Sequence, residues 1–191
     1  MNELNNEQTK SLYSSEYEHD ACGVGLVVNI NGSKYHDIIE KGLAVLENMA
    51  HRGAEGGDLK TGDGAGIMVQ IPHEFILLNG IPVPEKGRYG VGMVFLPKNP
   101  RDNARFTEII TECVEAHNLG IMHSRQVPVN SSILGKDALA SEPEIRQIFI
   151  TGCDDRKELE DKLYLVRKSI ERKVLDSSIK DKVGCYIASL S

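Results

Sequence analysis

The sequence lacks tryptophan, has few aromatic residues, and carries fewer basic residues than acidic ones. It holds 22 lysines and arginines against 28 aspartates and glutamates, which gives a formal net charge of −6. A nucleic-acid-binding surface needs an excess of positive charge, because it must replace the counterions along a phosphate backbone. We therefore expect no nucleic-acid partner.

Long apolar runs and paired cysteines are also missing. No apolar run approaches the roughly 20 residues that a membrane helix needs, and the first 21 residues lack the apolar core of a secretion signal. The four cysteines, at positions 22, 113, 153 and 185, form no C-x-x-C pair, which argues against a metal site or a disulfide framework. We expect no membrane association, no metal, and reduced thiols in the cytoplasm.

The first 21 residues differ in character from the rest. Residues 1–20 are polar and acidic with little to bury, so they cannot offset the entropy lost on ordering. The remainder is long enough for one sizeable domain. The sequence predicts a leader or propeptide over residues 1–21 and a folded domain over residues 22–191.

Hydrophobic periodicity predicts a mixture of strands and helices in the first half of that domain. The β-branched run 23–30 is of strand length, and Asn31-Gly32 behind it is a strong turn signal. Asp37 is expected to cap a helix that runs to about residue 50. A glycine-rich loop over residues 52–66, with positive φ angles, and a strand at 65–71 should follow.

The second half predicts alternating strands and helices in the order βαββαβ. The expected elements are a strand at 89–96, a helix at 102–117, strands at 120–127 and 145–151, a helix with its apolar stripe on Leu159, Leu163, Val166, Ile170 and Val174, and a strand at 183–190. This order predicts an α+β protein with a ferredoxin-like lobe over residues 89–191. Alternatively, the last strand returns to the sheet of the first half.

Cys22 stands apart from the other three cysteines, which we expect to be small buried apolar residues. It lies between the leader and the glycines Gly23 and Gly25, which would let a substrate approach the backbone closely. An α-amine has a pKa of about 7.7 to 8.0, close to ideal for a general base at neutral pH. Cleavage of the bond between Ala21 and Cys22 would give one residue both the thiol and that base. The hypothesis is an N-terminal cysteine nucleophile.

Three motifs stand in order along the chain: EHDACGVG at 18–25, HRGA at 51–54, and TGDGAGI at 61–67 with QIP behind it. Together with thinner matches at 146–150 and 186–191, they resemble the class II, or N-terminal nucleophile (Ntn), glutamine amidotransferases. Within that family they resemble the large subunits of glutamate synthases. The resemblance covers essentially the whole chain, and it implies the αββα sandwich of Ntn hydrolases.

The resemblance implies that Cys22 attacks the side-chain carboxamide of L-glutamine after a propeptide is removed. A γ-glutamyl thioester forms, ammonia leaves, and water frees glutamate. Synthase domains of the parent polypeptide would combine the ammonia with 2-oxoglutarate. Arg52 and Gly53 match the arginine-glycine pair that helps shape the glutamine pocket. Arg52 alternatively caps the preceding helix, where a cation is favoured, and Asp63 is expected to be a turn residue.

The resemblance also shows what these residues lack. The family's Asn-Gly oxyanion hole, its carboxylate-binding arginine and its amino-group aspartate are not found, and one lost oxyanion donor typically costs a hundredfold or more in rate. We expect an incomplete sandwich and an isolated chain without activity. FMN and an iron–sulfur cluster are expected only in the parent's other domains, with no cofactor in this segment. The alternative is a non-catalytic binding or regulatory domain with an inert Cys22.

Overall fold

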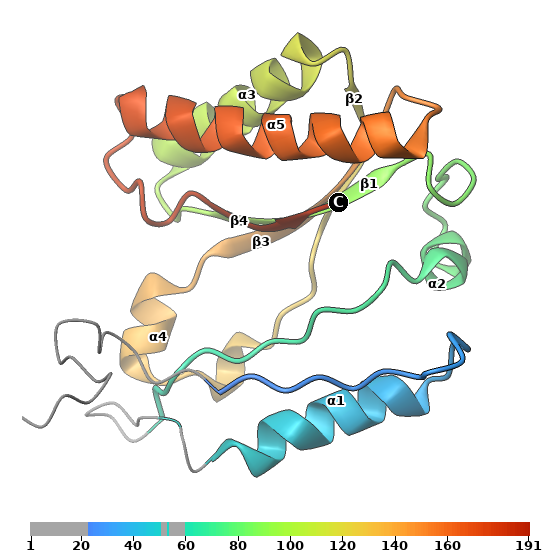
Figure 1. Ribbon diagram of the computed structural model, residues 1–191. Helices are drawn as coiled ribbons and strands as arrows, with labels where there is room; N and C mark the ends of the chain where they lie inside the picture. Colours follow the sequence, from blue (N-terminus) through green and yellow to red (C-terminus); the bar gives the residue numbers. More distant parts are fainter. Residues whose placement is uncertain (1–22, 51–52, 54–59) are drawn as a thin grey trace, which may run out of the picture. The chain divides into compact units, whose positions relative to one another are not determined.

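The computed structural model describes residues 23–50, 53 and 60–191, which fall into two compact units (Figure 1). The first unit contains the described residues up to 53 together with 62–68, and the second contains 60–61 and 69–191. The elements in chain order are α1 (Asp37–Asn48), α2 (His73–Leu78), β1 (Gly90–Leu96), α3 (Pro100–Ala116), β2 (Gly120–Gln126), η3 (Ser131–Ile133), α4 (Lys136–Ser141), β3 (Glu144–Thr151), α5 (Arg156–Asp176) and β4 (Tyr186–Leu190).

Helix α1 is present as predicted, but Asp37 does not cap it. The N-cap residue is His36, which makes no side-chain capping bond. Asp37 is the first residue of the helix and accepts a hydrogen bond from Lys41 Nζ at 2.9 Å, one turn further on. The predicted turn before the helix is confirmed, since the Gly32 N–H donates to the Asn29 carbonyl at 3.0 Å and Gly32 has a φ of 70°.

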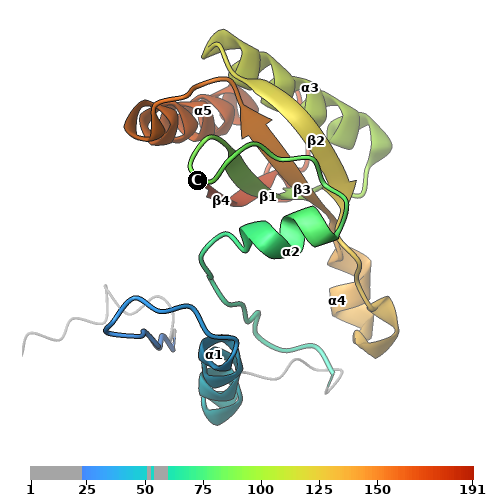
Figure 2. The ribbon, with the colours of Figure 1, turned by 90° about the vertical axis from the view of Figure 1, so that its right-hand side faces the viewer.

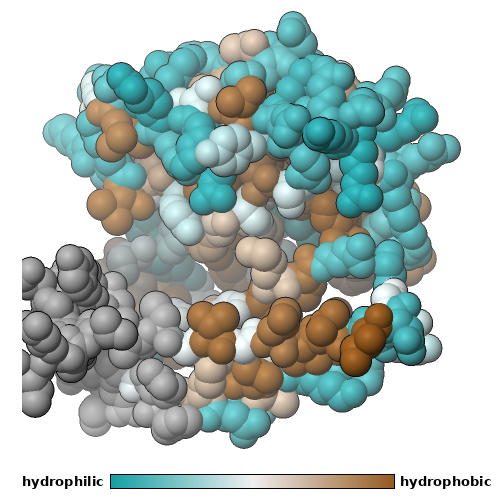
Figure 3. Space-filling view, viewed as in Figure 1, coloured by the Kyte–Doolittle hydropathy of each residue, from teal (hydrophilic) through white to brown (hydrophobic). Residues whose placement is uncertain are grey.

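The strands predicted at 23–30 and 65–71 are wrong for the described residues, because neither segment pairs with a neighbour. Residues 23–29 are extended. Alternate apolar side chains from Val24 to Ile30, at the start of the turn, have exposed fractions between 68% and 97%: Val24, Leu26, Val28 and Ile30. Figure 3 shows these apolar side chains along the extended segment. The local pattern is that of a strand, but a strand also needs a partner for its backbone hydrogen bonds.

The second unit is built on a four-stranded antiparallel sheet with the order β2-β3-β1-β4. The strands and the helices α3 and α5 follow the predicted βαββαβ order, and the protein is α+β. Strand β4 pairs with β1, as in the register Gly92 to Leu190. The alternative, in which the last strand joins a sheet of the first half, is therefore wrong. The short helices η3 and α4 between β2 and β3 were not predicted.

The main core lies between one face of this sheet and the helices α3 and α5 (Figure 2). All five residues of the predicted α5 stripe are buried. From α3, Phe106 and Ile109 are fully buried against them. A smaller core lies on the opposite face, where α2 and the segment after it pack on the sheet through Ile76, Ile81, Tyr89 and Phe149. The sheet is thus covered by apolar contacts on both faces.

Helix α3 is fixed at its N-terminal end by capping and by a buried carboxylate. The Asn99 side chain accepts hydrogen bonds from the N–H groups of Arg101 and Asp102, and Pro100 occupies the first helical turn. Asp102 is 7% exposed, and its Oδ2 accepts from the backbone N–H groups of Lys180 and Asp181 at 3.3 and 3.2 Å. This carboxylate ties α3 to the loop that leads into β4.

The outer face of α5 is charged, as the sequence predicts. Ion pairs one turn apart lie along it, such as Lys162 with Glu158 at 2.8 Å and Arg167 with Glu171 at 3.1 Å. Exposed pairs of this kind contribute little to stability, and they mark a solvated surface. Among the residues that the structure describes, no helix is long and apolar enough to cross a membrane.

Candidate active site

Two of the three predicted site residues, Cys22 and Arg52, lie outside the described residues, whereas Gly53 lies within them. The residue that follows each of the two along the chain is described. Gly23 follows Cys22 directly, and Gly53 follows Arg52. We therefore describe the candidate site through the contacts of these two glycines.

Gly23 and Gly25 lie against helix α1. A methyl group added at Gly23 would stand 2.8 Å from Met49 Sδ, and one added at Gly25 would stand 2.3 Å from Val45 Cγ1. The side chains of Met49 and Val45 lie on the Cβ side of these glycines, and the absence of a Cβ lets the extended segment pack closely on the helix. The prediction that the two glycines admit a substrate stays a prediction.

Gly53 lies at the C-terminal end of the same helix. Its N–H donates to the Ala50 carbonyl at 3.1 Å, and the residue is exposed. Met49, which packs on Gly23, is the C-cap residue of α1. The residues next to Cys22 and next to Arg52 therefore both adjoin one end of one helix, a convergence that the sequence reasoning missed.

The lengths of the extended segment and of helix α1 could have predicted this convergence. Seven extended residues from 23 to 29 cover about 23 Å, and the twelve residues of α1 cover about 18 Å. With the tight turn at Asn31-Gly32 between them, a helix of this length returns the chain to roughly the level of Gly23. The Ala50–Gly53 segment then follows at once.

The glycine-rich loop differs from the prediction in its backbone conformation. Gly53, Gly64 and Gly66, which lie in the described part of this loop, have no positive φ. A methyl group added at Gly64 or Gly66 would meet nothing within 4 Å. Asp63 is exposed within this loop. A need for positive φ angles therefore does not explain why glycine occupies these positions.

The other three cysteines are poor candidates for a nucleophile. Cys113 is buried, and this burial raises the pKa of its thiol. Burial, with Asp181 and Asp102 nearby, raises the pKa of Cys185 to about 11. Cys153 packs at the edge of the main core, and its thiol donates to the Asp155 carbonyl at 3.5 Å. A thiol held protonated is inert as a nucleophile, so at least two of the three are structural.

Neither Asn-Gly pair in the described residues is free to form an oxyanion hole. The Asn31 N–H donates to Asn29 Oδ1, and the Gly32 N–H donates to the Asn29 carbonyl. At the end of α2, the N–H groups of Asn79 and Gly80 donate to the Phe75 and Leu77 carbonyls. All four backbone donors are used within their own turns. In the described ranges, no three histidine, cysteine or acidic side chains gather as metal ligands would.

Comparison with known proteins identifies a family model that matches residues 22–191, described as class-II glutamine amidotransferases. The chain is 40% identical to the glutamate synthase (NADPH) large chain of Bacillus subtilis, over 96% of its own length. It is 41% identical to the glutamate synthase (NADH) of Saccharomyces cerevisiae over 83% of its length, and 39% identical to the ferredoxin-dependent glutamate synthase 2 of Synechocystis over 88%.

These relatives are much longer than this chain, which spans 12%, 8% and 11% of their respective lengths. The match is therefore to one portion of each relative. The names of the three relatives give three different electron donors, so the similarity carries no information about the donor of a parent enzyme. The similarity concerns the portion that these three relatives share with this chain, and in this chain that portion matches the class-II glutamine amidotransferase model.

Proposed function

Because this chain belongs to the class-II glutamine amidotransferase family, we propose that it hydrolyses L-glutamine with Cys22 as an N-terminal nucleophile. One observation carries this proposal: the family match begins at Cys22 and leaves the 21 preceding residues outside it. This start coincides with the boundary that the sequence predicts between a polar leader and a folded domain. On this proposal, residues 22–191 are the amidotransferase portion of a glutamate synthase enzyme, and residues 1–21 are a propeptide.

The proposed chemistry uses one residue twice. After the Ala21–Cys22 bond is hydrolysed, the new α-amine of Cys22 accepts the thiol proton, and the sulfur attacks the side-chain carbonyl carbon of glutamine. The carbon–nitrogen bond breaks, and ammonia leaves with a proton delivered by the ammonium group. Water then adds to the γ-glutamyl thioester, which releases glutamate and restores the thiol. The raised pKa values of Cys113 and Cys185 favour Cys22 for this role.

Arg52 and Gly53 are the proposed contacts to glutamine. Their support is the position of Gly53, at the end of α1 that also adjoins Gly23. The capping role of Arg52 has support of its own, because α1 has no basic residue in its last turn and a cation there is favoured. Kinetics separate the two roles: substrate contact predicts a raised KM for Arg52→Gln, whereas capping predicts lower helix stability with KM unchanged.

The exposed apolar side chains of the first unit support an incomplete sandwich. Four alternate residues of one extended segment, between Val24 and Ile30, have no cover among the described residues, and a soluble domain rarely leaves such a row in water. We propose that these apolar side chains belong to the core of an αββα sandwich that further residues of a parent polypeptide complete. Without those residues and their oxyanion donors, the 191-residue chain has no turnover.

In the parent enzyme, the ammonia would pass to synthase domains for glutamate formation from 2-oxoglutarate. FMN and an iron–sulfur cluster would belong to those domains, and the amidotransferase portion would bind neither. The shared portion of three synthase relatives with different electron donors supports this division.

The test is a mass measurement combined with labelling by the glutamine analogue 6-diazo-5-oxonorleucine, on a parent-length polypeptide that contains these residues. The expected result is a chain that begins at Cys22 and carries one adduct on that residue. The Cys22→Ala variant should retain residues 1–21 and take no label, and the matched Cys153→Ala variant should behave as wild type. A parent-length protein that keeps its leader, takes no label and hydrolyses no glutamine would establish the binding-domain alternative.

A further inference from the structure

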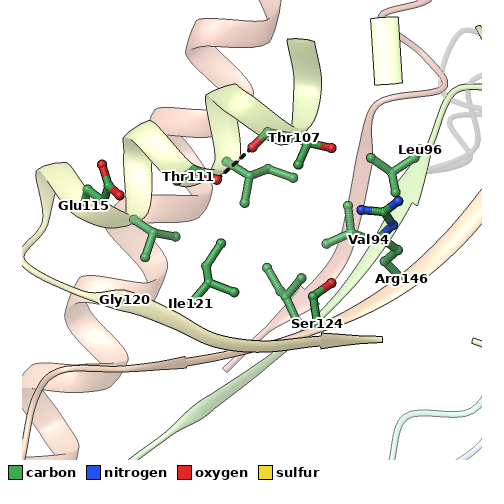
Figure 4. Close-up of a pocket in the computed structure, with 12 residues that line it drawn as sticks. Val94, Leu96, Thr107, Thr111, Glu115, Gly120, Ile121, Ser124 and Arg146 are labelled. Carbon is green, nitrogen blue, oxygen red and sulfur yellow. Dashed lines mark hydrogen bonds between the residues drawn. The ribbon is translucent and has the colours of Figure 1, made fainter. Parts of the chain in front are cut away.

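A cavity of about 370 Å³ lies within the second unit, between helix α3 and the strands β1, β2 and β3. Its interior is apolar, formed by residues of α3 and of all three strands: Val94, Leu96, Ile110, Val114, Ile121 and Ile148. The volume is at the lower end of the range that small-molecule sites occupy. Figure 4 shows this hollow between the helix and the sheet.

The cavity exists because small residues face one another where large ones would normally fill the space. Strand β2 contributes Gly120 and Ser124, and α3 contributes Thr107 and Thr111. Strand β2 is an edge strand, its register against β3 shifts between Ile121 and His123, and none of its residues is fully buried. Such an irregularity bends an edge strand locally. The cavity lies beside this irregular part of β2.

Among the polar groups that line the cavity, Arg146 carries an unused pair of donors. The hydroxyls of Thr107 and Thr111 donate to carbonyls one turn earlier in α3, at 2.9 and 3.1 Å. The Nε of Arg146 donates to Glu144 Oε1 at 2.6 Å, and Glu144 also accepts from Asn103 at 3.0 Å. Within the described part of the chain, the two terminal nitrogens of Arg146 have no partner. Glu144 thus positions the guanidinium and leaves its outer edge open.

Charge differs between the two ends of the cavity. Arg146 lies at one end beside Leu96, and Glu115 lies at the other (Figure 4). From Thr107 to Glu115, α3 advances about 12 Å. An elongated molecule with a negative group at the Arg146 end would match this polarity. A guanidinium with two adjacent free N–H groups binds a carboxylate in bidentate fashion.

We propose that this cavity is a binding site for a monocarboxylate with an apolar body of medium length. The carboxylate sits on the terminal nitrogens of Arg146, and the body lies against Val94, Ile110 and Ile148. This site is separate from the glutamine chemistry of the first unit, and it stands whether or not Cys22 is a nucleophile.

The experiment titrates the 191-residue chain with octanoate and with octanamide, its neutral counterpart, by calorimetry. Octanoate is expected to bind at least tenfold more tightly than octanamide, because only the carboxylate engages Arg146. The Arg146→Gln variant should bind both molecules with the affinity that octanamide shows. Equal binding of the two by wild type, or no binding of octanoate at millimolar concentration, overturns the proposal.

Two further variants separate a specific site from a general effect of charge or stability. Arg125→Gln is the matched control, since Arg125 also lies in the sheet with its Nε paired, to Gln147 at 2.8 Å, but does not line the cavity. It should keep the octanoate preference, and loss of that preference overturns the proposal. Thr111→Phe, which fills the hollow, should abolish binding of both molecules. If circular dichroism shows Thr111→Phe to be unfolded, the smaller Thr107→Leu change serves the same purpose.

Discussion

The carboxylate of Asp102 is expected to hold the loop before β4 in place, and its removal should be costly. Asp102 is buried, and its Oδ2 accepts two backbone hydrogen bonds from residues nearly eighty positions away. A hydrogen bond to a charged group contributes roughly 1.5 to 3 kcal/mol. Because both bonds are long, at 3.3 and 3.2 Å, the lower end applies to each. The Asp102→Ala variant should therefore lose about 3 kcal/mol of unfolding free energy.

The Asp102→Asn variant separates the contribution of the negative charge from that of the hydrogen-bond acceptor. An amide oxygen can still accept from the same N–H groups, so this variant should lose only about 1 kcal/mol. Asp154→Ala is the control, because the Asp154 side chain is 90% exposed and pairs with Arg88 only at the surface. It should leave stability unchanged within error.

Urea denaturation followed by circular dichroism measures the global effect, and hydrogen exchange at the amides of Lys180 and Asp181 measures the local one. Exchange at those two amides should accelerate most in Asp102→Ala, by a factor set by the lost free energy. The argument from the buried carboxylate is refuted if Asp102→Ala resembles Asp154→Ala in both measurements.

Three further predictions follow from close contacts and burial. Gly25→Ala should lose about 1 to 3 kcal/mol of unfolding free energy, because its new methyl group would stand 2.3 Å from Val45 Cγ1. Faster hydrogen exchange of the α1 amides would report this loss, and the additional change Val45→Ala should restore the stability. Gly64→Ala is the control, because its new methyl group would meet nothing within 4 Å. Phe149→Ala should lose about 3 to 5 kcal/mol in urea denaturation, since the ring is fully buried in the smaller core, and a loss under 1 kcal/mol would contradict that packing. Cys185 should react with iodoacetamide at pH 8 about a hundredfold more slowly than a thiol of ordinary pKa, because its pKa is raised to about 11. A raised folded-state pKa stabilises the fold at neutral pH, and that contribution should fall as the pH rises from about 9 to about 11. A labelling rate that levels off below pH 9 would contradict the assignment.

Much of the second unit could be predicted because its signals are local. The five apolar residues of α5 repeat at helical spacing, and all five are buried. The strands β1, β2 and β3 lie within one residue of their predicted bounds at every end. The sheet order then follows from βαββαβ topology. The short helix α4 was missed because its six residues lie in a passage rich in serine, glycine and proline.

The first unit was harder to predict because its structure depends on partners that a local pattern does not contain. Residues 23–30 alternate as a strand should, but no second strand pairs with them in the described residues. Asp37 is of a residue type that often caps helices, but its side chain forms an ion pair with Lys41 instead. The role of Cys22 came from motif order and from the chemistry of a free α-amine, which no periodicity encodes.

The pairing of β4 with β1 has a consequence for synthesis on the ribosome. Strand β1 lies between β3 and β4, so one of its edges remains open until Tyr186–Leu190 has emerged from the exit tunnel. Until then, the nascent chain presents an unpaired edge beside apolar residues such as Val94, and unpaired edges are templates for misassociation. A pause that delays residues 186–190 should therefore lengthen the interval in which this chain depends on chaperones.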